Sequence, residues 1–310
     1  MSVFKAYDIR GIAGTELDSE FSERLGKAVA THLDAECVSV VRDIRDSSPD
    51  YHEAFVRGVL STGADVIDLG ISTTGVLYRS TVDLPVDVAV AITASHNPPE
   101  YNGFKICKGK LPLGGEELQE IRRTFEAGDF REGSGDYMIM DSYVESYVDS
   151  IIDSVGGLSR DIRVVLDCGN AVPGPLAVKV LERLGVDVLP LYCDWDNSFP
   201  NHPPDPTRQE NMADLGRAVL EHGAEFGIGM DGDGDRLGVV DEGGRFIHPD
   251  RLMGIFVKEV LADLPENASE EQRTIFFDVK CSMALEEAIE ELGGVPRMVT
   301  VSYTHLTLPT

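Results

Sequence analysis

Three aspartates stand at alternate positions of one short stretch, and their spacing points to a bound cation. In GIGMDGDGDRLGVVDEGG, only glycine separates Asp231, Asp233 and Asp235. Carboxylates held this close repel one another unless a cation lies among them. The flanking apolar segments are predicted to be strands, which puts the triad on the turn between them. Three hard oxygen ligands on such a turn suit a divalent cation such as Mg²⁺, with positions left open for a phosphate.

A calcium-binding EF-hand is the first alternative for this triad. The aspartates would fill positions 1, 3 and 5 of its loop, and Glu242 would fill position 12. However, the glycine that the sharp turn at position 6 requires is replaced by Arg236, and the flanks are typical of strands instead of helices. The sequence therefore disfavours an EF-hand, and the arginine indicates that an anion is expected beside the cation.

A second stretch, AITASHNPPEYNGFKICKGK, places a serine and a histidine directly after a predicted buried strand. Ser95 and His96 are expected on a loop, because the residues that follow should exclude regular structure: Pro98, Pro99 and Gly103. The serine does not lie in a G-x-S-x-G sequence, which disfavours an acyl-transfer hydrolase.

The distribution of charge indicates a phosphate site beside this loop. The 310 residues include 54 Asp and Glu against 27 Lys and Arg, a formal net charge of -27. Such a field repels nucleic acid and anionic membranes, so neither is expected as a partner. Lys105, Lys108 and Lys110 nevertheless cluster just after the loop, as a phosphate site would require. The acidity itself is interpreted as adaptation to a salt-rich cytosol or, alternatively, as a plain acidic surface.

The elements expected to position these loops alternate between strand and helix. Short β-branched segments at 37–43, 64–70 and 86–93 are predicted to be buried strands. A helix is predicted to open with Ser48 as its N-cap and to end at Gly63. The alternation restarts at IRVVLDCGN and again at TIFFDVK, which predicts an α/β fold of repeated mixed-sheet units.

Glycine, serine and proline mark the expected domain boundaries. REGSGD (131–136) is predicted to connect domains, which gives a first domain at 1–140, a second at 141–245 and a third from 246 to 310. The proline-dense segment 194–209 is too long for an idle connection in a compact domain.

Cysteine usage and hydropathy favour a cytoplasmic protein. The five cysteines form no C-x-x-C pair, which suits free thiols in a reducing compartment better than a disulfide framework. The start MSVFKAYDIRG lacks the pattern of a secretory signal, and no long apolar run predicts a membrane span. The sequence carries no indication of oligomeric state.

These motifs together resemble those of the α-D-phosphohexomutase superfamily, and within it the phosphomannomutase/phosphoglucomutase branch. The resemblance rests on five stretches in the family's order: KAYDIRG (5–11), TASHNPPEYNGFKI (93–106), FPNHPPDP (199–206), GMDGDGDRLGVVDE (229–242) and DVKCS (278–282). It covers the chain from about Phe4 to about residue 300. It implies a mutase that interconverts hexose 1-phosphate and hexose 6-phosphate, of mannose or glucose, with one Mg²⁺ per chain and a hexose 1,6-bisphosphate intermediate.

The resemblance also assigns roles to individual residues. Ser95 would carry a phosphoryl group in the resting enzyme and would share the Mg²⁺ with Asp231, Asp233 and Asp235. His96, Lys105 and Lys280 would take acid, base or oxygen-stabilising roles. Arg10 and Arg236 would clamp the phosphoryl group.

The C-terminus departs from the family pattern. Members continue through a further sugar-reading loop and a fourth domain that holds the non-reacting phosphate, so the third domain is expected to be incomplete and the fourth absent. The final VSYTHLTLPT shows no continuation of the α/β pattern and is interpreted as a non-native tail. Because that phosphate helps to position the substrate, the chain on its own is expected to bind sugar phosphate poorly.

Three other functions stay open on the sequence. A non-catalytic module would bind a divalent cation without phosphorylation of Ser95. A hydrolase would release inorganic phosphate by way of an aspartyl nucleophile. A phosphoglucosamine mutase would share the motifs, although YDIRG and NPPEYNGFKI match the mannose and glucose pattern better.

Overall fold

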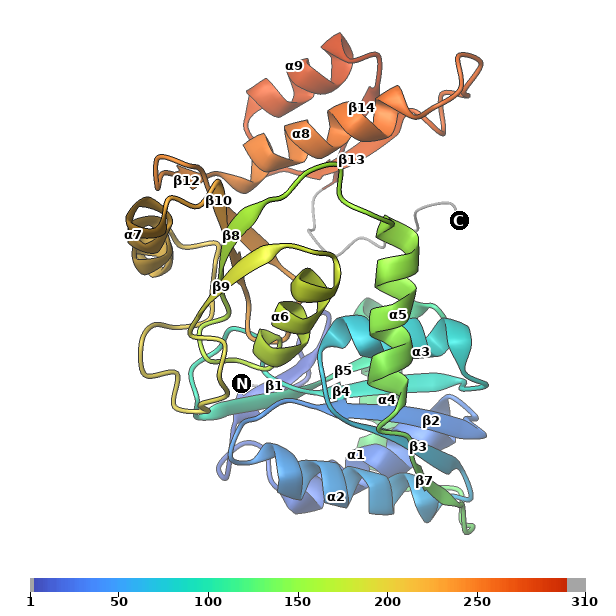
Figure 1. Ribbon diagram of the computed structural model, residues 1–310. Helices are drawn as coiled ribbons and strands as arrows, with labels where there is room; N and C mark the ends of the chain where they lie inside the picture. The colour runs from blue at the N-terminus through green and yellow to red at the C-terminus, as the bar shows by residue number, and fades with distance from the viewer. Residues whose placement is uncertain (1–2, 300–310) are drawn as a thin grey trace.

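The computed structural model describes residues 3–299, and three separate sheets, each with helices beside it, organise this part of the chain (Figure 1). The predicted α/β class with mixed sheets is confirmed. The segment VSYTHLTLPT, interpreted above as a non-native tail, lies outside the described residues.

The first sheet has the strand order β1-β5-β4-β2-β3-β7, with β6 beside β5. Strands β4, β2, β3 and β7 are parallel, whereas β5 runs antiparallel to β4 and β1 antiparallel to β5. Its strands are β1 (Ile9–Ile12), β2 (Cys37–Arg42), β3 (Asp65–Ile71), β4 (Val88–Ile92), β5 (Tyr101–Lys108), β6 (Leu111–Pro112) and β7 (Tyr137–Ile139).

Helices cover both faces of this sheet (Figure 1). On one face lie α1 (Ser19–His32), α2 (Ser48–Leu60) and α4 (Gly115–Ala127), and on the other lie α3 (Thr74–Asp83) and α5 (Tyr143–Val155). Strand β4 alternates between the two cores, with Val88 and Val90 in the first and Ala89 and Ala91 in the second. Burial on both sides explains why β4 reads as the unbroken apolar run VAVAI.

Two local expectations were wrong. Gly103, expected to exclude regular structure, lies inside β5, where an added Cβ would be 2.2 Å from the carbonyl oxygen of Ile9 on β1. The glycine therefore permits close strand pairing instead of preventing it. The N-cap position of helix α2 is Ser47, which makes no side-chain capping hydrogen bond, and not the expected Ser48, whose hydroxyl donates to Asp43. The helix ends at Leu60 and not at Gly63.

The second sheet has the order β12-β11-β10-β8-β9. Strands β10, β8 and β9 are parallel, and β11 returns antiparallel to β10, so the aspartate triad occupies the turn of a hairpin. The elements are β8 (Arg163–Asp167), α6 (Gly174–Arg183), β9 (Asp187–Leu191), a 3₁₀ turn (Gln209–Met212), α7 (Ala213–His222), β10 (Phe226–Met230), β11 (Leu237–Val240) and β12 (Phe246–Ile247).

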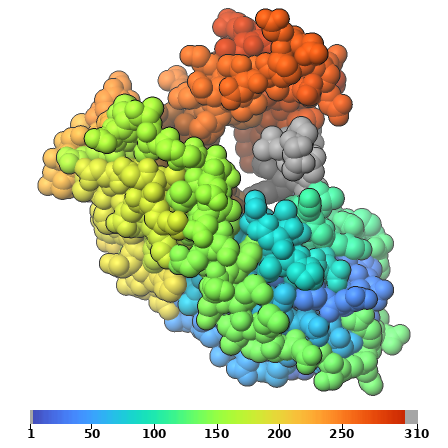
Figure 2. Space-filling model, turned by 45° about the vertical axis from the view of Figure 1, so that its right-hand side comes forward, coloured from blue at the N-terminus to red at the C-terminus, as the bar shows by residue number. Residues whose placement is uncertain are grey.

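The third sheet consists of two parallel strands, β13 (Thr274–Asp278) and β14 (Val295–Val299). Helices α8 (Pro249–Ala262) and α9 (Met283–Glu291) pack on it around a small core of Val257, Phe277, Leu285 and Ile289. In Figure 2 this orange and red lobe lies at the opposite end of the molecule from the blue part of the chain. Among residues 3–299, no helix has both the length and the apolar character needed to cross a membrane.

Candidate active site

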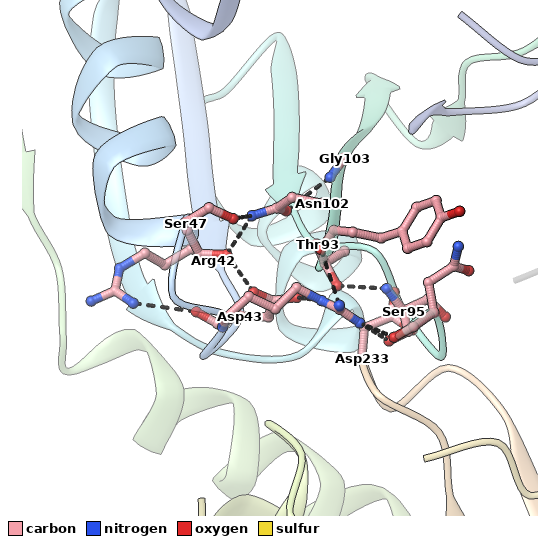
Figure 3. A network of polar contacts seen from close by, with 12 residues as sticks. Arg42, Asp43, Ser47, Thr93, Ser95, Asn102, Gly103 and Asp233 are labelled. Atoms are coloured by element: carbon pink, nitrogen blue, oxygen red, sulfur yellow. Dashed lines mark hydrogen bonds and ion pairs between the residues drawn. The ribbon is translucent and has the colours of Figure 1, made fainter. Parts of the chain in front are cut away.

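Ser95 lies on a tightly held loop that follows the carboxyl end of β4. Its side chain is almost completely buried, and its backbone adopts the left-handed conformation, with φ of 52°. The N–H of Ser95 donates to Thr93 Oγ1 at 2.9 Å, as Figure 3 shows, and the N–H of Thr93 donates to the carbonyl of Gly103 on β5 at 3.0 Å. A non-glycine residue in this conformation is held there by its surroundings, which is typical of functional loops.

The three aspartates approach one another on the turn between β10 and β11. One ligand oxygen from each of Asp231, Asp233 and Asp235 lies within 4.8 Å of the others. Asp231 and Asp233 are buried, whereas Asp235 reaches the surface. The backbone N–H groups of Asp235 and Arg236 both donate to Asp231 Oδ1 at 2.9 Å, which fixes the turn from within.

The serine loop and the aspartate turn touch directly. Ser95 Oγ donates to Asp231 Oδ2 at 2.8 Å, although the two residues are 136 positions apart in the sequence. Gly232 presses against the same loop, since an added Cβ would lie 2.1 Å from the carbonyl oxygen of Ser95. From the other side, the backbone N–H of Thr74 at the start of α3 donates to the carbonyl of Asp233 at 3.1 Å.

Lys105 supplies positive charge to the aspartates. Its Nζ, on β5, lies 2.5 Å from Asp233 Oδ2 and 2.6 Å from Asp235 Oδ2. Burial opposes the charge on this lysine, but the two carboxylates outweigh that effect and raise its pKa well above the ordinary value. Burial, together with the charges of Asp233 and Asp235, raises the pKa of Asp231.

His96 and Arg236 lie at the rim of the same contact. His96 Nδ1 is 3.2 Å from Ser95 Oγ, and Arg236 Nη1 donates to the same nitrogen at 3.3 Å. Burial and the neighbouring Arg236 charge lower the pKa of His96. Arg236 therefore points toward the serine, where an anion bound to Ser95 Oγ would meet it.

Arg10, on β1, reaches the serine loop from the opposite side of β5. Its Nη1 donates to Asn97 Oδ1 at 2.7 Å, and its Nη2 donates to Asp8 Oδ2 at 2.6 Å. Its Nε is buried and donates to no described residue. The pairing with Asn97, which lies two positions after Ser95, was not predicted from the sequence.

Lys280 is the one sequence-predicted site residue that the structure does not bring into this cluster. It follows β13 in the third lobe, its side chain is exposed, and that side chain makes no hydrogen bond or ion pair with the described residues. The contacts described above link the other eight predicted site residues: Ser95, His96, Lys105, Arg10, Arg236, Asp231, Asp233 and Asp235.

The donor set fits a hard divalent cation. Both carboxylate oxygens of Asp233 are buried, and Oδ1 accepts no hydrogen bond from the described residues. A buried carboxylate oxygen without a donor is costly, and a cation would satisfy it. Carboxylate and hydroxyl oxygens are the ligands that Mg²⁺ prefers.

Comparisons with known proteins point to one family. Residues 1–132 match the phosphoglucomutase/phosphomannomutase α/β/α domain I, and residues 141–244 match domain II of the same family. The phosphomannomutase/phosphoglucomutase of Pseudomonas aeruginosa is 40% identical over 300 residues, and the phosphoglucomutase of Neisseria gonorrhoeae is 38% identical over 295 residues. These matches cover 96% and 94% of this chain, but 63% of each relative.

Solved structures give the same result. A phosphoglucomutase/phosphomannomutase family protein from Burkholderia thailandensis superposes with a TM-score of 0.90 at 37% identity, over 97% of this chain and 66% of that one. The N-acetylphosphoglucosamine mutase of Aspergillus fumigatus, solved with GlcNAc-6P and magnesium, shares the fold at 18% identity and a TM-score of 0.52, over 87% of this chain and 48% of that one. The chain belongs to the phosphoglucomutase/phosphomannomutase family, and it spans less than two thirds of the length of the curated relatives named here.

Proposed function

We propose that this chain carries the phosphoserine and metal-binding half of a phosphohexomutase, which interconverts hexose 1-phosphate and hexose 6-phosphate of mannose or glucose. The observation that carries the proposal is the 2.8 Å hydrogen bond from Ser95 Oγ to Asp231 Oδ2. It joins a buried serine to a cluster of carboxylates, an arrangement suited to metal-assisted phosphoryl transfer.

Asp231, Asp233, Asp235 and the oxygen of Ser95 would hold one Mg²⁺. When bound, the ion would offset the charge of a phosphoryl group on Ser95 during its transfer. Magnesium is also the metal in the structure of the fungal N-acetylphosphoglucosamine mutase named above.

In each transfer the phosphoryl group moves between Ser95 Oγ and a hydroxyl oxygen of the substrate. The bond from phosphorus to Ser95 Oγ breaks, and its electron pair stays on Oγ. A bond forms from phosphorus to the substrate hydroxyl, whose proton passes to a base. The resulting hexose 1,6-bisphosphate would then return its other phosphoryl group to Ser95, which completes the isomerisation.

His96, Lys105 and Lys280 are our candidates for the acid and base steps. His96 has the strongest geometric support, because its ring nitrogen lies 3.2 Å from Ser95 Oγ. Lys105, whose pKa is raised by its two carboxylate partners, keeps its positive charge and is suited to stabilise negative charge on a transferring oxygen. Arg10 and Arg236 would clamp the phosphoryl oxygens, since a guanidinium matches phosphate with two parallel donors.

The same proposal divides the chain at about residues 140 and 245 and places it in the cytoplasm. The three separate sheets support the division, with the second sheet continuing two residues past 245 through β12 (Phe246–Ile247). The location is supported by the five cysteines, all of which are free thiols.

The test is phosphorylation of the wild-type chain by glucose 1,6-bisphosphate with Mg²⁺. We expect the intact mass to rise by one phosphoryl group that maps to Ser95, and we expect no gain with Ser95→Ala or without the metal. Isomerised hexose phosphate, assayed from mannose 1-phosphate, glucose 1-phosphate and glucosamine 1-phosphate, would identify the substrate. Uptake of metal without phosphate would instead indicate a cation-binding module, and steady release of inorganic phosphate would indicate a hydrolase.

A further inference from the structure

A third arginine, Arg45, is buried against the serine loop. It follows β2 and precedes α2, and only 1% of its side chain is exposed. Its Nε donates to Asp43 Oδ2 at 3.0 Å, so one buried carboxylate balances its charge. Burying an ion pair costs free energy that well-packed apolar side chains would not, so hydrophobic packing alone does not explain an arginine at this position.

The rest of the guanidinium is directed at the serine loop. Arg45 Nη2 donates to the carbonyls of Ser95 at 2.8 Å and Asn97 at 2.7 Å. Arg45 Nη1 donates to the carbonyls of Pro98 at 2.5 Å and Tyr101 at 3.0 Å. One side chain therefore donates to four backbone carbonyls, three on the loop that precedes β5 and one on Tyr101, the first residue of β5.

These contacts hold the peptide that sets the direction of the Ser95 side chain. Ser95 has a positive φ, which a non-glycine residue adopts only at a cost, of order 1 kcal/mol. Arg45 grips its carbonyl oxygen while Gly232 packs against the same oxygen from the aspartate turn. With its peptide held by Arg45 and Gly232, Ser95 directs its Oγ toward Asp231.

The proline-rich segment 194–209 closes over the guanidinium from the second unit. The ring of Phe199 lies 5.4 Å from the guanidinium carbon of Arg45, within range of a cation–π contact. The neighbouring Asn197 donates to Asp46. Figure 3 shows this region, with Asp43, Ser95 and Asp233 drawn together around one polar network.

We propose that Arg45 is a positioning residue for phosphoryl transfer: its guanidinium holds four carbonyls of the segment 95–101 so that Ser95 Oγ faces the aspartate turn. The inference rests on the proposed function, because it concerns the transfer at Ser95. A residue that merely stabilises the fold would affect stability alone. A positioning residue changes the rate of transfer at saturating donor and leaves the binding of the donor unchanged.

The experiment measures the rate of phosphoryl uptake by Ser95 from glucose 1,6-bisphosphate in single turnover, by intact mass. Arg45→Lys keeps the charge but cannot span four carbonyls, and Arg45→Gly leaves a space for free guanidinium. We expect the saturating rate to fall about 100-fold in both, with an unchanged half-saturating donor concentration. Millimolar guanidinium should restore much of the rate in Arg45→Gly.

Arg42→Lys is the matched control. Arg42 stands three positions earlier at the end of β2, and among residues 3–299 its Nη1 donates only to the carbonyl of Asp43, at 3.2 Å. Should the Arg45 variants not fold, Phe199→Leu removes only the ring over the guanidinium and should slow uptake by about fivefold.

The outcomes separate the two proposals. Uptake by wild type with equal rates in folded Arg45→Lys would overturn the positioning role alone, as would equal rates in Phe199→Leu where the Arg45 variants do not fold. A slower rate that follows a lower unfolding temperature, without rescue by guanidinium, would also overturn it. Absence of uptake by the wild-type chain would overturn the proposed function and this inference together.

Discussion

Lys105 and Asp233 form a buried ion pair between the first and second sheets, with Nζ 2.5 Å from Oδ2. The lysine comes from β5 and the aspartate from the turn after β10. The same ammonium lies 2.6 Å from Asp235. Lys105 therefore supplies part of the positive charge that the carboxylates require when no metal is bound.

Replacement of Lys105 by glutamine should make the chain depend more strongly on metal. We expect the metal-free variant to lose about 3 kcal/mol in its free energy of unfolding, because the carboxylate of Asp233 stays buried without its partner. Added Mg²⁺ should then raise the unfolding temperature more in the variant than in wild type. Thermal unfolding with EDTA and with Mg²⁺ measures both effects, and the exposed Lys108→Gln is the control. Equal metal-induced shifts in Lys105→Gln and wild type would contradict the expectation.

Substitution of Gly232 by alanine should separate the serine loop from the aspartate turn. The new methyl group would lie 2.1 Å from the carbonyl oxygen of Ser95, so one of the two backbones must move. We expect Mg²⁺ affinity, measured by calorimetric titration, to fall about 10- to 100-fold. Gly254→Ala in α8 adds a methyl group with nothing within 4 Å and should bind the metal like wild type. An unchanged affinity in Gly232→Ala would show that the two loops do not depend on each other.

His202 should stabilise the fold in a pH-dependent way. Burial opposes its charge, but the hydrogen bond and the charge of Asp167, at 2.9 Å from Nε2, raise its pKa above the ordinary value. The other nitrogen, Nδ1, lies 2.8 Å from the carbonyl of Pro203, so both contacts are satisfied as donors only in the protonated ring.

The sign of the effect follows from the raised pKa of His202. The stabilisation is complete below the unfolded pKa, about 6.5, and is lost as the pH rises through the higher folded pKa. We expect wild type to exceed His202→Gln in free energy of unfolding by about 2 kcal/mol at acidic pH and by less at alkaline pH. Denaturant titrations across the range test this, with the exposed His222→Gln as control. A difference that stays constant with pH would contradict it.

Salt should stabilise the chain if its acidity is an adaptation to a salt-rich cytosol. At a net charge of -27 the surface repels itself, and raising KCl from about 0.1 M to about 1 M shortens the screening length from ~10 to ~3 Å. We expect a gain of roughly 1 kcal/mol, or about 2–4 °C in unfolding temperature. The gain should disappear near the isoelectric point of about 4.5, where the net charge vanishes. A salt response that is the same at both pH values would contradict the electrostatic origin.

The reactive residues of the site could be predicted from the sequence better than the residues that hold the serine loop in place. Ser95 and the aspartates carry their function in residue type and spacing, and the structure brings them within hydrogen-bond distance. Arg45 was missed because a lone arginine beside an aspartate reads as a surface ion pair; its position directly after the buried strand β2 was the available signal. Its four carbonyl partners depend on the tertiary path of the loop, which no local pattern specifies.

The fold, too, could be predicted only in part from local sequence patterns. The buried strands β2, β3 and β4 were predictable from short β-branched runs, since such runs suit strands covered on both faces. The antiparallel strands β1 and β5 were not, because prolines and glycines there read as loop signals, and their pairing joins segments that lie far apart in the chain. The roles of Lys280 and of the domain boundaries stay predictions.

The segment 194–209 touches the back of both reactive loops, at Arg45 through Phe199 and at Gly232 through the carbonyl of Pro204. The segment thereby links the first two sheets, so that any separation of the two would disturb the position of Ser95. If the proposed mutase opens to admit a hexose phosphate, we therefore expect the hinge to lie after β12, where the third lobe begins.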